Sequence, residues 1–128
     1  MIWDIVCYMA RIKKTSNEDA ELITVFDWIR LHKDIEPFAW HVGNERKCTA
    51  AQGLKLKRKG VKAGVSDICL MIPSKGYHGA FIELKYGDGK PTKSQEKFLA
   101  NMDKQNYFTA VCWGADEAIE MIEWYLKP

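Results

Sequence analysis

The sequence predicts an α/β fold in which helices flank both faces of a mixed β-sheet. Apolar runs at 66–72 and 79–86 stand on either side of the turn-forming stretch PSKGYHG, which is typical of an antiparallel β-hairpin. The chain then continues with a helical pattern at 93–105, an apolar strand at 107–113 and a helical pattern at 115–126. A strand, a helix and a further strand in this order indicate a parallel pair joined by a crossover. The sheet would therefore combine both strand directions.

Length and composition are those of an ordinary single globular domain. The chain has 128 residues, of which 47% are hydrophobic and 28% are charged. No apolar stretch approaches the roughly 20 residues of a membrane span, and the first residues lack the basic start of a signal peptide. We therefore expect a cytoplasmic protein with no membrane partner. The four cysteines contain no CxxC spacing, so free thiols are expected rather than disulfides or a zinc site.

The N-terminal part divides into an extension and the first helix of the domain. Residues 1–14 are apolar and then basic, and we predict an extra strand or arm here, ahead of a single domain at 15–128. Ser16 is predicted to cap the first helix, with Asp19 in a capping-box position. Residues at helical spacing mark the buried face of this helix: Leu22, Val25, Phe26 and Ile29.

Two acids of this helix are candidates for a functional site. Glu18 lies on the same helical line as the apolar stripe, and a carboxylate there is costly unless something pairs with it. A metal ion, or a water bound to one, would provide such a partner. Glu21 lies at the edge of the same face and is the alternative. A third interpretation is that acids gather here only because they suit the positive end of the helix dipole.

A basic segment follows the predicted short strand PFAWHV. Residues near 46–59 are predicted to be helical, with Gly60 as the stop. One acid, Glu45, accompanies the cations between 44 and 62, which are Arg46, Lys47, Lys55, Lys57, Arg58, Lys59 and Lys62. Such a cluster can neutralise DNA phosphates and release counterions, and Arg46, Lys47 and Lys55 are the candidate contacts. A solvated helix end explains the same charges, because cations suit C-terminal turns.

The hairpin carries an acid on each strand. Side chains alternate along a strand, so Glu83 and Lys85 share one face, and Asp67 at the start of the first strand lies roughly opposite Glu83. Mg²⁺ prefers hard oxygen ligands, which Asp67, Glu83 and the backbone carbonyl of Leu84 would supply. Lys85 would hold and help to deprotonate the attacking water, or stabilise charge on a phosphate. An ion pair on a solvated strand face is the simpler alternative.

The helix at 93–105 begins with a second capping box, formed by Thr92 and Gln95. Capping alone explains a glutamine at this position. In the hairpin loop, Tyr77 and His78 would contact substrate or pack on the edge of the domain.

The pattern D-(x)n-E-x-K formed by Asp67, Glu83 and Lys85 lies within a longer string, GVKAGVSD … GYHGAFIELK … GKPTKSQEKFL … NYFTAVCWGADEAIEMIEWYL. Over roughly residues 16–126, this string resembles the VRR-NUC (virus-type replication-repair nuclease) family of the PD-(D/E)xK nuclease superfamily, in particular its small stand-alone phage and bacterial members. One departure is Ser66, which stands before Asp67 where the superfamily pattern has proline. That proline shapes the backbone and takes no part in the chemistry.

The resemblance implies a restriction-endonuclease-like core and a DNA endonuclease that depends on Mg²⁺ or Mn²⁺. The implied catalytic residues are Glu18, Asp67, Glu83 and Lys85, and the implied metal ligands are Asp67, Glu83 and the Leu84 carbonyl. The resemblance also places Gln95 close to the catalytic strand, where it would hold a phosphate or orient Lys85, with capping as the simpler alternative. Relatives of this type resemble Holliday-junction resolvases and tend to form homodimers. Branched DNA, either a four-way junction or a flap, is therefore the expected substrate, and a phage or prophage the expected source, which would place the protein in the host cytoplasm.

Two other functions are compatible with the sequence. A catalytically inactive nucleic-acid-binding module would be expected to have lost one of Asp67, Glu83 and Lys85, and all three are present. A sequence-specific, restriction-like endonuclease would need a recognition element that so short a chain does not show.

Overall fold

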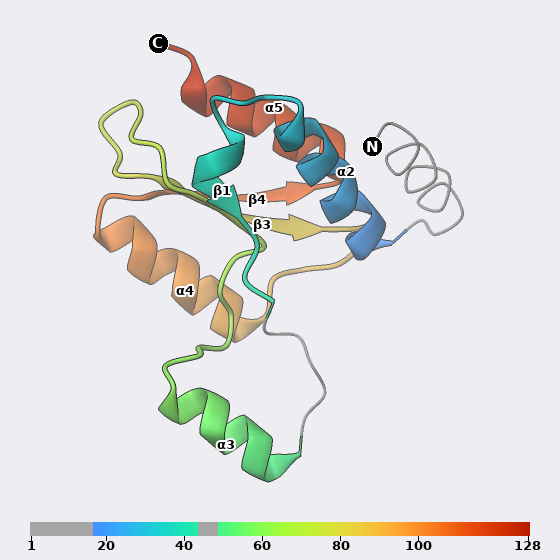
Figure 1. The fold of residues 1–128 in the computed structure, drawn as a ribbon, viewed down its shortest axis with the longest axis vertical. Helices are drawn as coiled ribbons and strands as arrows, with labels where there is room; N and C mark the ends of the chain where they lie inside the picture. The colour runs from blue at the N-terminus through green and yellow to red at the C-terminus, as the bar shows by residue number, and fades with distance from the viewer. Residues whose placement is uncertain (1–16, 44–48) are drawn as a thin grey trace.

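The computed structural model describes residues 17–43 and 49–128, which form an α/β domain (Figure 1). The predicted fold class is confirmed: a mixed four-stranded sheet carries helices on both faces. The elements in chain order are α2 (Glu18–Arg30), a short 3-10 helix (Glu36–Phe38), β1 (Ala39–Trp40), α3 (Ala50–Arg58), β2 (Ile68–Leu70), β3 (Ala80–Lys85), α4 (Lys93–Lys104), β4 (Phe108–Trp113) and α5 (Ala115–Leu126).

The strands are arranged in the order β1-β2-β3-β4, with β1, β2 and β3 antiparallel and β4 parallel to β3. The hairpin and the parallel crossover pair are therefore confirmed. In the hairpin, Ile68 pairs with Ile82, and the same register places Asp67 opposite Glu83. The first strand is shorter than predicted because the chain turns away into a loop that is closed by reciprocal backbone hydrogen bonds between Ser74 and Tyr77.

The two faces of the sheet are covered by different helices. Helices α2 and α5 pack together over one face of β3, and α4 packs on β3 and β4 from the other side (Figure 1). Side-chain alternation divides β3 between these layers, since Ile82 and Leu84 are fully buried in the main core and Phe81 meets Phe98 of α4 with ring centroids 5.2 Å apart. The predicted apolar stripe of α2 contributes to this main core, together with Ala118, Ile122 and Tyr125 of α5.

Helix α2 begins one residue later than predicted. Asn17, and not Ser16, is the N-cap, because its backbone is extended and its side-chain oxygen accepts the Ala20 N–H at 2.9 Å. Asparagine caps helices at least as well as serine. Ser16 lies outside the described residues, as does the predicted extension at 1–14, so the domain boundary at residue 15 stays a prediction.

Helix α3 also begins later than predicted, at Ala50, because Thr49 and Gln52 form a capping box there. It ends at Arg58 with Lys59 as the C-cap, and the φ of +94° at Gly60 directly after the cap agrees with the predicted stop. No residue of α3 is buried, and Figure 1 shows this helix (green) standing off from the sheet. Its basic last turn, with Lys55, therefore faces solvent.

A second turn fixes the approach to β2. Gly64 has a φ of +82°, and a Cβ atom there would lie 2.4 Å from the backbone oxygen of Ser94. Only glycine fits a backbone this close to its neighbour in this conformation. The segment that leads to Asp67 is thus packed against the start of α4.

Several smaller expectations can be compared with the described residues. Cys69 and Cys112 are buried free thiols, as predicted, whereas Cys7 and Cys48 lie outside the described part of the chain. Tyr77 packs against Phe108 and Tyr125, which favours the packing interpretation of the hairpin loop. Within the described ranges, no helix has the length and apolar character needed to cross a membrane.

Candidate active site

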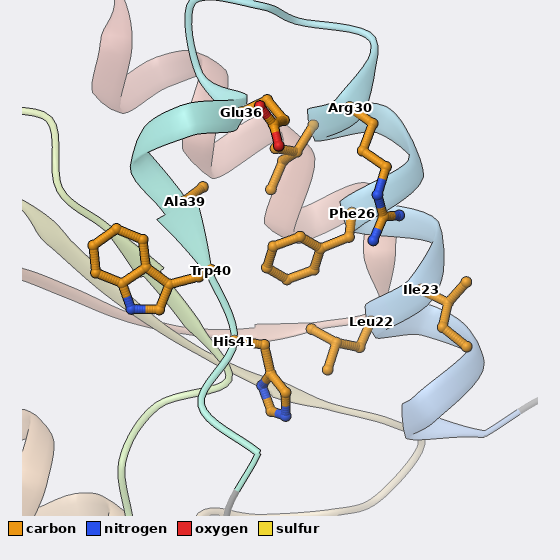
Figure 2. Close-up of a pocket in the computed structure, with 9 residues that line it drawn as sticks. Leu22, Ile23, Phe26, Arg30, Glu36, Ala39, Trp40 and His41 are labelled. Atoms are coloured by element: carbon orange, nitrogen blue, oxygen red, sulfur yellow. The ribbon is translucent and has the colours of Figure 1, made fainter.

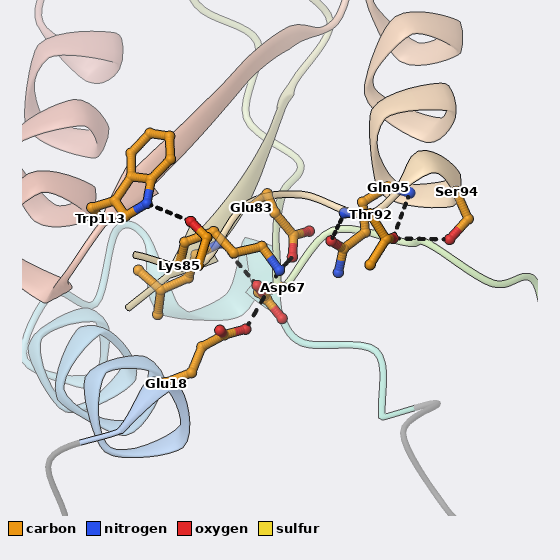
Figure 3. A network of polar contacts seen from close by, with 10 residues as sticks. Glu18, Asp67, Glu83, Lys85, Thr92, Ser94, Gln95 and Trp113 are labelled. Carbon is orange, nitrogen blue, oxygen red and sulfur yellow. Dashed lines mark hydrogen bonds and ion pairs between the residues drawn. The ribbon is translucent and has the colours of Figure 1, made fainter. Parts of the chain in front are cut away.

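Three acidic side chains from different parts of the chain meet at one end of the sheet. Glu18 comes from the first turn of α2, Asp67 from the residue before β2, and Glu83 from β3 (Figure 3). One carboxylate oxygen of each lies within 4.8 Å of the other two. This distance allows all three carboxylates to share one divalent cation.

Asp67 is held by backbone contacts on both sides. Its Oδ2 accepts the Leu84 N–H at 2.8 Å, and its backbone carbonyl accepts a hydrogen bond from Nδ1 of His41 at 2.7 Å. The N–H and C=O of one strand residue point to the same side of the strand. The Leu84 carbonyl therefore also points toward the Asp67 side of β3, as its predicted role as a ligand requires.

Glu83 is the most deeply buried acid of the group, with 1% of its surface exposed. Neither of its carboxylate oxygens accepts a hydrogen bond from the residues that the structure describes. Burial, and then the neighbouring Asp67, raise the pKa of Glu83 to about 8, against the opposing effect of Lys85. A buried carboxylate without donors is costly, and a cation at this point would supply the missing interactions.

Lys85 is placed between two of the acids. Its Nζ lies 3.5 Å from Oε1 of Glu83 and 3.8 Å from Oε1 of Glu18, and its side chain is 8% exposed. Both distances are those of ion pairs and exceed normal hydrogen-bond lengths. Among the described residues, three acids therefore share one ammonium group, and a cation that displaces the proton of Glu83 would meet an excess of negative charge.

The structure separates the two acids of α2 that the sequence left as alternatives. Oε2 of Glu21 accepts the Ala115 N–H at 2.8 Å, at the beginning of α5. The N-cap residue of α5 is Gly114, which has no side chain with which to cap the helix. Glu21 therefore supplies the cap from a neighbouring helix, whereas Glu18 lies with Asp67 and Glu83.

A model of the VRR-NUC domain matches residues 11–116 of the chain. The chain belongs to the VRR-NUC family. Among solved structures, it is similar to a VRR_NUC domain protein, with a TM-score of 0.77 and 29% sequence identity over 86% of this chain and 88% of that one. No match was found among curated proteins. Membership of this nuclease family agrees with the resemblance seen in the sequence.

The residues predicted to bind nucleic acid lie in different parts of this VRR-NUC domain. Gln95 forms the expected capping box, and its Oε1 accepts the Thr92 N–H at 2.8 Å. Figure 3 draws this cap on the Glu83 side of the polar network. Lys55 lies on α3, away from the carboxylates, whereas Arg46 and Lys47 lie outside the described residues.

Two residues near the site were missed by the sequence analysis. His41 ends a groove of about 380 Å³ between α2 and β1, with Leu22 and Phe26 along its wall and Arg30 and Glu36 at its other end (Figure 2). A carbonyl only accepts hydrogen bonds, so the bond to Asp67 requires the proton on Nδ1 of His41. A single histidine after a short strand carries no sequence signal for this contact.

The second missed residue is Trp113, at the end of β4. Its Nε1–H donates to the Gly89 carbonyl at 2.8 Å, in the loop that follows Lys85 (Figure 3). The sequence analysis had treated this tryptophan only as the end of an apolar strand.

Proposed function

We propose that this VRR-NUC domain is a DNA endonuclease that depends on Mg²⁺ or Mn²⁺ and hydrolyses phosphodiester bonds in branched DNA. The observation that carries this proposal is the buried carboxyl group of Glu83, which accepts no hydrogen bond from the described residues, has Lys85 as its cationic neighbour and lies within 4.8 Å of two further acids. A purely structural acid would be expected to have donors around it.

The donor atoms at the site fit a hard divalent cation. Asp67, Glu83 and the Leu84 carbonyl offer oxygen ligands, and Glu18 would bind directly or through a water molecule. When bound, such an ion would neutralise charge developing on the phosphate and favour deprotonation of water.

The protein groups around the cation would orient the reactants. Lys85 carries its ammonium group between Glu18 and Glu83, from where it can donate hydrogen bonds to a phosphate oxygen or to the attacking water. The Glu18 side chain is 45% exposed and can accept a hydrogen bond from that water. The reaction would be an in-line displacement at phosphorus without a covalent intermediate on the protein.

The finer parts of the proposal rest on the family resemblance. Small stand-alone relatives resemble Holliday-junction resolvases, and a four-way junction offers two symmetric strands to a two-fold homodimer. We therefore infer a homodimer from a phage or prophage that acts on four-way junctions or flaps in the host cytoplasm. Gln95 near the site, together with Arg46, Lys47 and Lys55, would contact backbone phosphates.

The test is cleavage of a labelled four-way junction, with flap and linear duplex DNA as controls, in Mg²⁺, Mn²⁺ and EDTA. We expect paired nicks in the junction that require a divalent ion. The matched inactive variant is Asp67→Asn, because it keeps an oxygen acceptor for the Leu84 N–H. Asp67→Ala would leave this donor unpaired at a cost of about 1–3 kcal/mol. Tight binding of the wild type to DNA without cleavage in any ion would overturn the nuclease proposal and leave a binding module.

A further inference from the structure

Trp113 is a large aromatic side chain that lies beside Lys85. The two residues are direct partners in the parallel ladder of β3 and β4. Partners on neighbouring strands lie about 4.8 Å apart and point to the same face of the sheet. Trp113 is therefore on the face that carries Glu83 and Lys85, and 42% of its surface is exposed.

The indole ring of Trp113 is fixed in place. Its only polar group, Nε1–H, donates to the Gly89 carbonyl at 2.8 Å (Figure 3). Gly89 in turn donates its N–H to the Tyr86 carbonyl, and a Cβ on Gly89 would lie 3.8 Å from Cδ of Lys85. The Trp113 ring is thus bonded to the loop that follows Lys85, and this loop passes close to the Lys85 side chain. Because the N–H is already bonded, the surface that the indole offers to a partner is apolar.

We propose that Trp113 stacks against an unpaired base of the DNA strand next to the scissile phosphate. The inference rests on the proposed function for the position of that phosphate at Lys85. An aromatic ring binds any base through its π-face, whatever the sequence, and a ring held in one orientation loses little conformational entropy on binding. A base within a continuous duplex is not accessible for such stacking. The contact would therefore favour flaps, whose single-stranded arm carries unpaired bases at the branch.

A simpler role for Trp113 is to fasten the loop through its bond to Gly89. The variant Trp113→Phe separates the two roles, because phenylalanine keeps an aromatic ring and loses the N–H donor. Trp124 provides a matched control, because it is also exposed, at 49%. It lies nine positions after Ala115, which is at the active-site end of α5, and this spacing corresponds to about 13 Å along the helix axis. Its ring also faces the ammonium group of Lys75, with Nζ 4.9 Å from the ring centroid.

The experiment measures DNA binding in EDTA, so cleavage does not enter the result. The probes are flap DNAs that carry either all bases or one abasic analogue at successive positions near the branch. We expect Trp113→Ala to weaken binding of intact DNA by roughly 5- to 150-fold, and Trp113→Phe and Trp124→Ala to change it little. One abasic position should weaken binding of the wild type by a similar factor while leaving Trp113→Ala unaffected.

Two results would overturn the inference. If Trp113→Phe binds as weakly as Trp113→Ala, then the residue serves the loop. If no abasic position weakens the wild type, no base stacks there, and this result does not depend on whether any variant folds. Failure of the nuclease proposal would look different, since the wild type would then cut no DNA with Mg²⁺ or Mn²⁺ while the abasic position still weakened its binding.

Discussion

Replacing Glu83 with glutamine should stabilise the metal-free protein in alkaline solution while removing its response to divalent ions. The reason is the environment of this carboxylate, which is 1% exposed, accepts no hydrogen bond from the described residues and has only an ion-pair contact of 3.5 Å with Lys85 among them. The charged form of Glu83 destabilises the metal-free protein, and a bound cation would stabilise it. The same substitution should therefore abolish cleavage and raise the free energy of unfolding.

The size of the effect follows from the pKa of Glu83, which rises from 4.5 to about 8, first through burial and then through the neighbouring Asp67. The folded protein thus holds this proton more tightly than the unfolded chain does. The stability contributed by protonated Glu83 is complete below about pH 4.5 and is lost as the pH rises through about 8. At about 1.4 kcal/mol per pH unit, the loss is on the order of 5 kcal/mol.

Glutamine has no proton to lose in this range, so the variant avoids that loss. Its buried amide still lacks partners, which costs about 1–3 kcal/mol. The net gain near pH 9 should be on the order of 2–4 kcal/mol, or an increase of about 10 °C in Tm for a domain of this size.

The assay is thermal unfolding in EDTA from pH 5 to 9, repeated with Mn²⁺ and Mg²⁺. The wild type should lose stability between pH 5 and 8 and recover it when the ion is added. Glu83→Gln should show neither change, and Glu96→Gln, an exposed acid on α4, should behave like the wild type. A lower Tm of Glu83→Gln than of the wild type in EDTA at pH 9 would refute the reasoning, as would equal stabilisation of both proteins by Mn²⁺.

Two further pairs of variants test the roles assigned to neighbouring residues. Glu18→Ala should lower the cleavage rate by roughly 10- to 100-fold with little change in Tm. Glu21→Ala should instead cost about 1 kcal/mol of stability, because the α5 cap is lost, and should leave cleavage nearly unchanged. If Glu21 and not Glu18 were the active-site acid, these two results would be reversed. Gly64→Ala should lower the free energy of unfolding, measured with denaturant, by more than about 2 kcal/mol, because it combines a positive φ with a clash against Ser94. Gly60→Ala has the same sign of φ but open space around the added Cβ, so it should cost only about 1–2 kcal/mol. Equal losses for the two glycine variants would exclude a role for the Ser94 contact.

The parts of the fold and site that could be predicted from the sequence are governed by local rules. Alternation along a strand, together with a hairpin turn between two apolar runs, is enough to bring Asp67 opposite Glu83 and to put Lys85 on the same face. The capping box at Gln95 and the stop at Gly60 follow from equally local chemistry.

The remaining features depend on contacts between elements that are distant in sequence. Glu18 and Glu21 both suit the first turn of a helix, and only the position of α5 assigns Glu21 to a cap. The bond from His41 to Asp67 spans 26 residues, and that from Trp113 to Gly89 spans 24. No pattern in the sequence indicates that these residues meet, because the packing of the sheet determines their separation.

The acids at and beside the site differ in the backbone hydrogen bonds that they accept. Glu21 accepts a backbone N–H and stabilises the start of α5, and Asp67 accepts another from Leu84. The position before Asp67 is the buried Ser66, whose hydroxyl has no hydrogen-bond partner among the described residues, and the His41 side chain bonds the Asp67 carbonyl next to it. Glu83, although the most buried, accepts no hydrogen bond from the described residues and has the Lys85 ammonium group 3.5 Å from its Oε1. The backbone thus donates hydrogen bonds to Asp67 and Glu21 but not to Glu83. A cation bound at the site would supply the favourable interaction that the Glu83 carboxylate lacks, as the proposed metal-dependent nuclease requires.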